Sequence, residues 1–265
     1  MKRYLSGLIS RSIRQIMFFF GRFLVLSLLL IFVSSSIRGR GGAVLGKVYY
    51  YLVMPGVVCH ETAHAAACFF TGMQIVEFEP FKPHGDTLGY VKWDPGKISL
   101  WTFAAAFLIG TAPLWVGCAV VWGICRILIK TGFLQDTCSS VILIPPSGFF
   151  YWKRVASASF SMMKALFKNW NFKSVAYIFI IYLLFCIISE MPPSIPDLQA
   201  AFPGIILFIV IFFVLNVIPF IGEKINNLTI RLKSVFFTLH SVIVFVLLLD
   251  LLFFLCIALP FSIIS

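Results

Sequence analysis

Charged residues are scarce in this sequence. Only 12% of its 265 residues are charged, whereas 60% are hydrophobic. A water-soluble domain usually has about a quarter of its residues charged, so this composition excludes an ordinary soluble protein. The sequence therefore predicts that most of the chain lies in a lipid bilayer.

Acidic residues are scarcer than basic ones, with ten Asp and Glu against 21 Lys and Arg and a net charge of +11. The basic residues stand mainly between apolar runs, where they set membrane topology beside anionic lipid. The sequence has neither a recognition-helix motif nor an aromatic and basic platform for single strands. We therefore expect the lipid bilayer, and not nucleic acid, as a partner.

Closely spaced cysteine pairs are also missing. The seven Cys include no C-x-x-C pair, and six of them lie in or at the edge of apolar runs. This pattern indicates small buried hydrophobic side chains.

Long apolar runs, in contrast, are abundant. Six are long enough to span a bilayer, at about 16–36, 48–71, 100–128, 174–190, 202–221 and 234–262. The weaker stretch 141–167 contains two Pro and several basic residues, which favours an interfacial or re-entrant segment. We expect an all-α polytopic integral membrane protein with about six transmembrane helices, located in the cell membrane.

The chain shows no internal repeat and no low-complexity linker, so we expect one membrane domain in three parts. Residues 1–46 form a basic N-terminal segment with the first membrane segment. Residues 47–222 form the membrane core, and residues 223–265 form a C-terminal membrane helix.

A short region between the second and third runs has a different pattern. Polar and apolar residues alternate roughly over 74–78 and again over 89–93, with a loop containing Pro, His, Gly and Asp between them. This pattern predicts a β-hairpin. An open strand edge cannot face lipid, so the hairpin must lie at the interface or inside the protein.

The second apolar run contains a metal-binding pattern, because residues 60–64 read His-Glu-Thr-Ala-His. His60 and His64 are four residues apart on one helix face, so both imidazoles can bind one ion, and Zn²⁺ suits them. Glu61 can take a proton from zinc-bound water. These polar side chains are costly to bury in lipid, which favours a functional site over a structural polar cluster.

A catalytic zinc needs a third protein ligand. Asp197 is our preferred candidate, since it ends the Pro-rich segment 189–197 between two spans, where broken backbone can line a cavity. The same residue can instead cap the next helix. Asp250 is also a candidate buried partner for His240. The alternative third ligands are Glu190, Glu223, Asp250 and His84.

Taken together, these features resemble the site-2 protease family of intramembrane zinc metallopeptidases, in its bacterial and archaeal branch. The resemblance covers roughly residues 47–222. It rests on the 60–64 motif inside a span, Thr71-Gly72 followed by a hairpin that ends in Gly89-Tyr90-Val91, the segment around Asp197, and Asn216 in the next span. The family's later Asp-Gly pair is replaced by Gly222-Glu223 after Pro219.

The resemblance implies that His60, His64 and a later Asp hold zinc, and that Glu61 is the general base. It implies cleavage of peptide bonds of membrane protein or peptide substrates in or near the membrane. Asn216 is then expected to bind the substrate backbone or the oxyanion.

Residues 89–93, with Gly89 and Tyr90, are the expected free strand edge for an unwound substrate segment. Two other functions stay open: a non-proteolytic membrane protein with a structural zinc site, and a metal-handling transporter. A transporter needs polar groups along a path through several spans, and acids are few in this chain.

Overall fold

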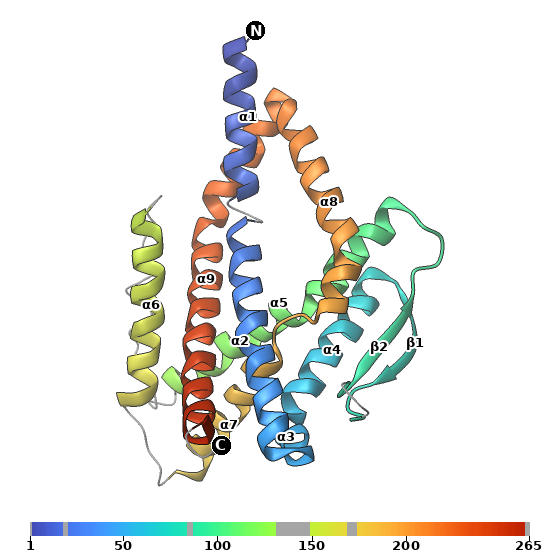
Figure 1. Cartoon of the computed structure of the whole chain (residues 1–265). Coiled ribbons are helices and arrows are strands. Elements are labelled where there is room, and N and C mark those ends of the chain that lie inside the picture. Colours follow the sequence, from blue (N-terminus) through green and yellow to red (C-terminus); the bar gives the residue numbers. More distant parts are fainter. Residues whose placement is uncertain (1, 18–20, 84–86, 131–148, 169–173, 263–265) are drawn as a thin grey trace.

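The protein is built almost entirely from helices, with one small sheet at its side (Figure 1). The computed structural model describes residues 2–17, 21–83, 87–130, 149–168 and 174–262. In chain order the elements are α1 (Lys2–Ile16), α2 (Arg22–Leu45), α3 (Lys47–Leu52), α4 (Met54–Thr71), β1 (Gln74–Glu79), β2 (Tyr90–Asp94), α5 (Leu100–Lys130), α6 (Phe149–Lys168), α7 (Val175–Glu190), α8 (Ile195–Val217) and α9 (Pro219–Ser262).

Four of the described helices are long and apolar enough to cross a membrane, which supports the expected polytopic membrane protein. The candidate spans are Leu24–Leu45, Leu100–Leu128, Ile195–Asn216 and Asn227–Leu255. The expected number of six is not confirmed. Helix α7 has 16 residues, which gives about 24 Å of rise against a hydrocarbon core of about 30 Å. Helix α4 carries the polar motif and is not among the four candidates. Location in the cell membrane stays a prediction.

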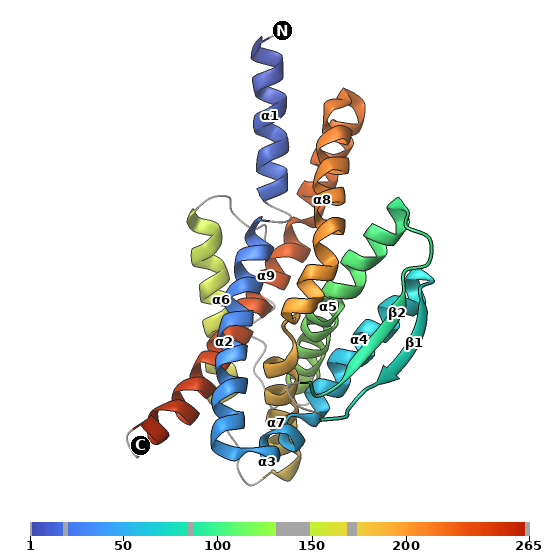
Figure 2. The same ribbon diagram turned by 45° about the vertical axis from the view of Figure 1, so that its right-hand side comes forward.

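The stretch expected to be interfacial or re-entrant is described only in part. Residues 141–148 lie outside the described residues, and the rest belongs to α6. This helix packs along α9 in both views (Figures 1 and 2). Tyr151, Val155 and Ala158 of α6 form a buried cluster there with Phe237 of α9. Packing against α9 therefore accounts for the apolar face of α6.

The main hydrophobic core lies where α2, α5, α6, α7 and α9 meet. Helix α4 packs against α5 and α7, and α8 packs against α5. Glycines permit these close approaches. A side chain at Gly56 of α4 would collide with the main-chain carbonyl of Cys186 in α7, and one at Gly110 of α5 would collide with the main chain of Asp197. These contacts set how closely α4 approaches α7 and how closely the start of α8 approaches α5.

The three-part division at residues 46 and 222 stays a prediction. In the fold, α2 from the first part packs against α9, most of which belongs to the last part. The two flanking parts therefore contribute to one common core with the central part.

The predicted hairpin is confirmed. Helix α4 ends at Thr71 and is capped by Gly72, whose φ of 73° lies in the left-handed region that glycine adopts without strain. Strands β1 and β2 pair antiparallel from Gln74 opposite Asp94 to Glu79 opposite Tyr90, with a bulge between Ile75 and Glu77. The hairpin lies along α4 at the edge of the helical bundle (Figures 1 and 2).

The contact at Gly56 gives a test of the packing between α4 and α7. We expect Gly56→Ala to destabilise the protein by about 1–3 kcal/mol, because the new methyl group overpacks this crossing. The measurement is thermal unfolding of the purified protein in detergent.

Gly123→Ala in α5 is the matched control, since a Cβ at Gly123 meets no atom within 4 Å. The control should unfold at the wild-type temperature or slightly above it, because Ala favours helix over Gly. Equal unfolding temperatures for the two variants would contradict this packing.

Candidate metal centre

The two histidines of the motif face each other on α4. Their Nε2 atoms lie 3.1 Å apart, and their ring centroids are separated by 4.8 Å. The four-residue spacing on a helix produces this alignment. His64 is buried and His60 is half-buried, so the pair lies inside the protein.

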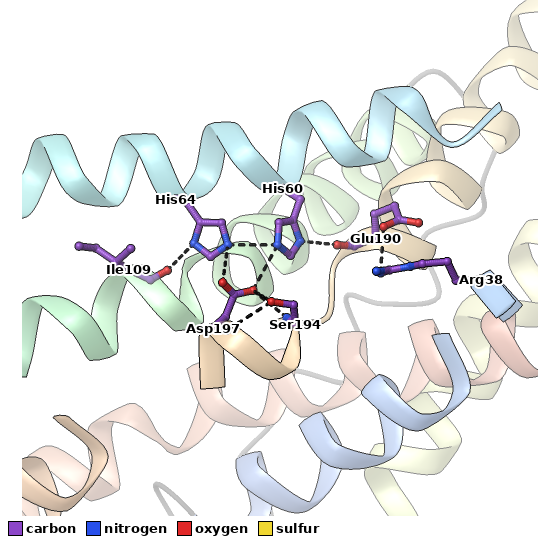
Figure 3. A network of polar contacts seen from close by, with 7 residues as sticks. All are labelled: Arg38, His60, His64, Ile109, Glu190, Ser194 and Asp197. Atoms are coloured by element: carbon purple, nitrogen blue, oxygen red, sulfur yellow. Dashed lines mark hydrogen bonds and ion pairs between the residues drawn. The ribbon is translucent and has the colours of Figure 1, made fainter. Parts of the chain in front are cut away.

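Asp197 reaches the same point from the first turn of α8. Its carboxylate lies 3.5 Å from Nε2 of His60 through Oδ2, and 3.4 Å from Nε2 of His64 through Oδ1. Asp197 also forms a capping box with Ser194, whose amide and hydroxyl both donate to Oδ2. The N-cap of α8 is Ser194 and not Asp197, which stands at the third helical position of the capping box and also faces the histidines (Figure 3).

Both imidazoles are oriented by main-chain carbonyl groups of other helices. Nδ1–H of His60 donates to the carbonyl oxygen of Glu190 at 2.6 Å, and Nδ1–H of His64 donates to that of Ile109 at 2.8 Å. Each carbonyl is available for a local reason. Glu190 ends α7, where carbonyls have no partner in the helix. Ile109 lies four residues before Pro113, which has no N–H to offer it.

These two contacts decide which ring nitrogens have free lone pairs. A carbonyl oxygen can only accept, so Nδ1 of each neutral histidine is the donor and Nε2 is an acceptor. With both histidines neutral, two Nε2 lone pairs and a carboxylate converge within 3.5 Å without a donor among them. A cation between the three groups would stabilise this arrangement. Metal-bound histidines usually donate their second ring nitrogen to a carbonyl or carboxylate in the same way.

The spacing also fits a metal ion. Ligand bonds of about 2.0–2.1 Å in a tetrahedral site place ligand atoms about 3.3–3.4 Å apart. The observed contacts range from 3.1 to 3.5 Å, with one oxygen of Asp197 facing each histidine. With one atom taken from each residue, all three lie within 4.8 Å of one another. His60, His64 and Asp197 are the one group of this kind within the described part of the chain.

The three side chains open onto a cavity of about 480 Å³. Glu61 also lines this cavity and is 8% exposed. Gly89 packs directly against it, since a Cβ at Gly89 would lie 2.9 Å from Cγ of Glu61. The cavity is lined by Arg38, Val57, His60, Glu61, His64, Thr87, Leu88, Gly89, Tyr90, Val91, Trp93, Ala106, Ile109, Gly110, Glu190, Ser194, Pro196, Asp197 and Ala200.

The hairpin contributes to the cavity through β2 and the residues before it. Residues 87–91 and Trp93 line the cavity, whereas no residue of β1 does. The hydroxyl of Tyr90 donates to Glu77 on β1, and Lys92 donates to the same carboxylate at 2.7 Å. These bonds from Lys92 and Tyr90 hold the pKa of Glu77 below its ordinary value. The predicted residues Gly89 and Tyr90 thus lie at the cavity, and the Tyr90 hydroxyl is already engaged with β1.

The other candidate third ligands either have different partners or are not described. The carboxylate of Glu190 pairs with Arg38 at 2.9 Å. Asp250 accepts a hydrogen bond from Ser34 at 2.7 Å. His84 and the side chain of Glu223 lie outside the described residues.

The proposed pairing of Asp250 with His240 is wrong. These residues lie about three turns apart on α9, and Nδ1 of His240 is hydrogen bonded to the hydroxyl of Tyr151 in α6.

Asn216 is not brought to the cavity. It lies about five turns along α8 from Asp197 and is buried, with its amide donating to the carbonyl oxygen of Phe212 at 2.9 Å. The expected contact between Asn216 and a substrate beside the motif therefore has no support in this arrangement. Helix α8 runs away from α4 toward its C-terminal end (Figure 1).

Three contributors to the site were missed by the sequence analysis, and each had a signal. Ser194 stands three residues before Asp197, which is the spacing of a capping box. Pro113 lies inside an apolar helix and frees one carbonyl. Arg38 is a basic residue within a candidate span, where a charge calls for a partner.

Comparison of the chain with protein-family models, with curated proteins and with solved structures finds no match. The assignment of this site therefore depends on its geometry and on the motif.

The role of Pro113 can be tested by Pro113→Ala. The new N–H competes with His64 for the carbonyl of Ile109, so we expect the affinity for a divalent metal to fall by about tenfold. The thermal stability of the protein should rise, because a proline inside a helix is unfavourable. Titration with Co²⁺ against a competing chelator gives the affinity.

Pro203→Ala in α8 is the matched control, because Pro203 is also inside a helix and does not line the cavity. It should raise stability without changing metal affinity. Wild-type affinity in Pro113→Ala would exclude the proposed role of the freed carbonyl.

Proposed function

We propose that this chain is a membrane zinc metallopeptidase that hydrolyses peptide bonds of membrane protein substrates. His60, His64 and Asp197 would hold the zinc, and Glu61 would act as the general base. The observation that carries this proposal is the convergence of three acceptor groups on one point of a cavity that Glu61 also lines. The same residue types at this spacing carry the resemblance to site-2 proteases.

The donor set supports zinc among the metals. Two imidazoles and one carboxylate are the ligands of many catalytic zinc sites, which keep a further position open. When bound by such a set, zinc polarises a peptide carbonyl and lowers the pKa of a coordinated water toward 7. The opening of the three ligands onto a cavity supports an accessible site.

Glu61 would move the proton. A carboxylate oxygen of Glu61 accepts a proton from the attacking water and returns it to the nitrogen of the departing amine, so the peptide C–N bond breaks and a C–O bond forms. Glu61 directly follows His60 in α4. Packing of Gly89 against its side chain restricts its position, as this transfer requires.

The edge of β2 is our candidate for holding the substrate. A peptide bond within a helix has its carbonyl hydrogen bonded, so the substrate must unwind locally before it is cleaved. An extended segment can add to a free strand edge through main-chain hydrogen bonds. The lining of the cavity by β2 and not by β1 supports the β2 edge for this role.

The two alternative functions fit these observations less well. A structural zinc site is usually closed by four protein ligands, whereas the described residues supply three at a cavity. A transporter needs ligands at several depths along a path. In the described part of the chain, a single ligand cluster is found.

The general base can be tested by Glu61→Gln. We expect cleavage of a membrane substrate in proteoliposomes to fall by about 10²–10⁴-fold, because the amide cannot accept the proton. Zinc content, measured by mass spectrometry, should stay at one ion per chain because Glu61 is not a ligand. Glu79→Gln on the exposed hairpin is the matched control and should retain activity. If Glu61→Gln cleaves at the wild-type rate, the assigned mechanism is wrong.

The contact between the hairpin and the base can be tested by Gly89→Ala. The added methyl group displaces Glu61 or the strand, so we expect turnover to fall by about 10–100-fold while zinc is retained. Gly123→Ala serves again as the control for an added methyl group. Full activity in Gly89→Ala would show that this close approach does not matter to the reaction.

A further inference from the structure

Arg38 is a basic residue within the candidate span Leu24–Leu45 of α2. A charge at such a position is costly and usually has a partner or a function. The partner here is Glu190 at the end of α7, with Nη2 of Arg38 lying 2.9 Å from Oε2 of Glu190. Arg38 also lines the cavity that holds the metal ligands.

The two members of this ion pair differ in exposure. The side chain of Arg38 keeps 37% of its surface exposed, whereas that of Glu190 keeps 5%. Arg38 is therefore the more exposed member of the pair, and both residues line the cavity. A guanidinium has five N–H donors, and Glu190 engages it through one nitrogen. The pair is neutral overall, and its cationic member is the more exposed one.

Glu190 connects the ion pair to the candidate metal ligands, because it contacts both Arg38 and His60. Its carbonyl oxygen accepts from His60, and its carboxylate pairs with Arg38. Figure 3 shows Glu190 between His60 and Arg38. Arg38 and both histidines line one cavity, so a ligand that fills it can contact all three.

We propose that Arg38 is a specificity-determining residue that binds a carboxylate of the peptide substrate close to the cleaved bond. This inference rests on the proposed peptidase function. Guanidinium and carboxylate form paired, charge-assisted hydrogen bonds, and such bonds are strongest where water is scarce. An acidic side chain and a free C-terminus both supply this carboxylate, and the test separates them.

The test uses short fluorogenic peptides of Ala and Leu that contain one Glu at successive positions. Each is matched to a Gln version, and each is made with a free or an amidated C-terminus. We expect the zinc-loaded protein to prefer one carboxylate position by about tenfold in kcat/KM, as one charge-assisted contact provides. Preference for Glu over Gln indicates a side-chain carboxylate, and preference for the free over the amidated end indicates the C-terminus.

Arg38→Gln should remove this preference, and Arg38→Lys should retain part of it. Arg40→Gln is the matched control on the same helix, because Arg40 lies 4.9 Å from the ring centre of Phe254 and does not line the cavity. It should keep the wild-type preference. The proposal is overturned if Arg38→Gln discriminates like the wild type, or if the wild type does not discriminate.

Binding of the same peptides to the Glu61→Gln protein, measured by fluorescence anisotropy, separates this inference from the proposed function. If the wild type cleaves no peptide while binding prefers a carboxylate and loses this preference in the Glu61→Gln, Arg38→Gln double variant, peptidase activity fails and the carboxylate site stands. If cleavage occurs without any preference, the carboxylate site fails and the peptidase stands. Absence of both cleavage and binding overturns both.

Discussion

The arrangement of the candidate metal centre depends on two hydrogen bonds from imidazole N–H groups to main-chain carbonyls. His60 donates to Glu190 of α7, and His64 donates to Ile109 of α5. Each bond fixes both the tautomer and the orientation of a ring. Because the carbonyls belong to two helices, the ligand geometry of α4 is set by the positions of its neighbours. The motif provides the ring nitrogens, and the carbonyls of the neighbouring helices orient the two rings.

Close helix packing places these carbonyls. Gly56 lets α4 approach α7, and Gly110 lets the start of α8 approach α5. The close contact between α5 and the start of α8 also places Asp197 beside the histidines. Helix packing therefore determines where the candidate ligands lie. A displacement of any of these helices would change several ligand distances together. Interiors are packed densely enough to transmit such displacements.

Much of the site could be predicted from sequence because its signals are local. The spacing of His60 and His64 follows from the helix repeat, and the hairpin follows from alternating residues and a turn-rich loop. Asp197 was identified from its broken backbone between two spans. Arg38 and the position of Asn216 depend on which helices meet and how long each one is, and periodicity does not encode this. The number of spans is not confirmed, because apolar composition alone does not distinguish a span from a shorter apolar helix such as α7.

The capping box at the start of α8 has a consequence for how the centre is assembled. The amide and hydroxyl of Ser194 hold the Asp197 carboxylate by bonds that involve no metal, and carbonyls hold both imidazoles in the same way. All three ligands are thus fixed by the protein's own hydrogen bonds. Small zinc domains differ, because their ligands come together only when the ion binds and drives folding. In this protein the three candidate ligands are already held by the folded chain, so binding of a metal ion would depend on access through the cavity.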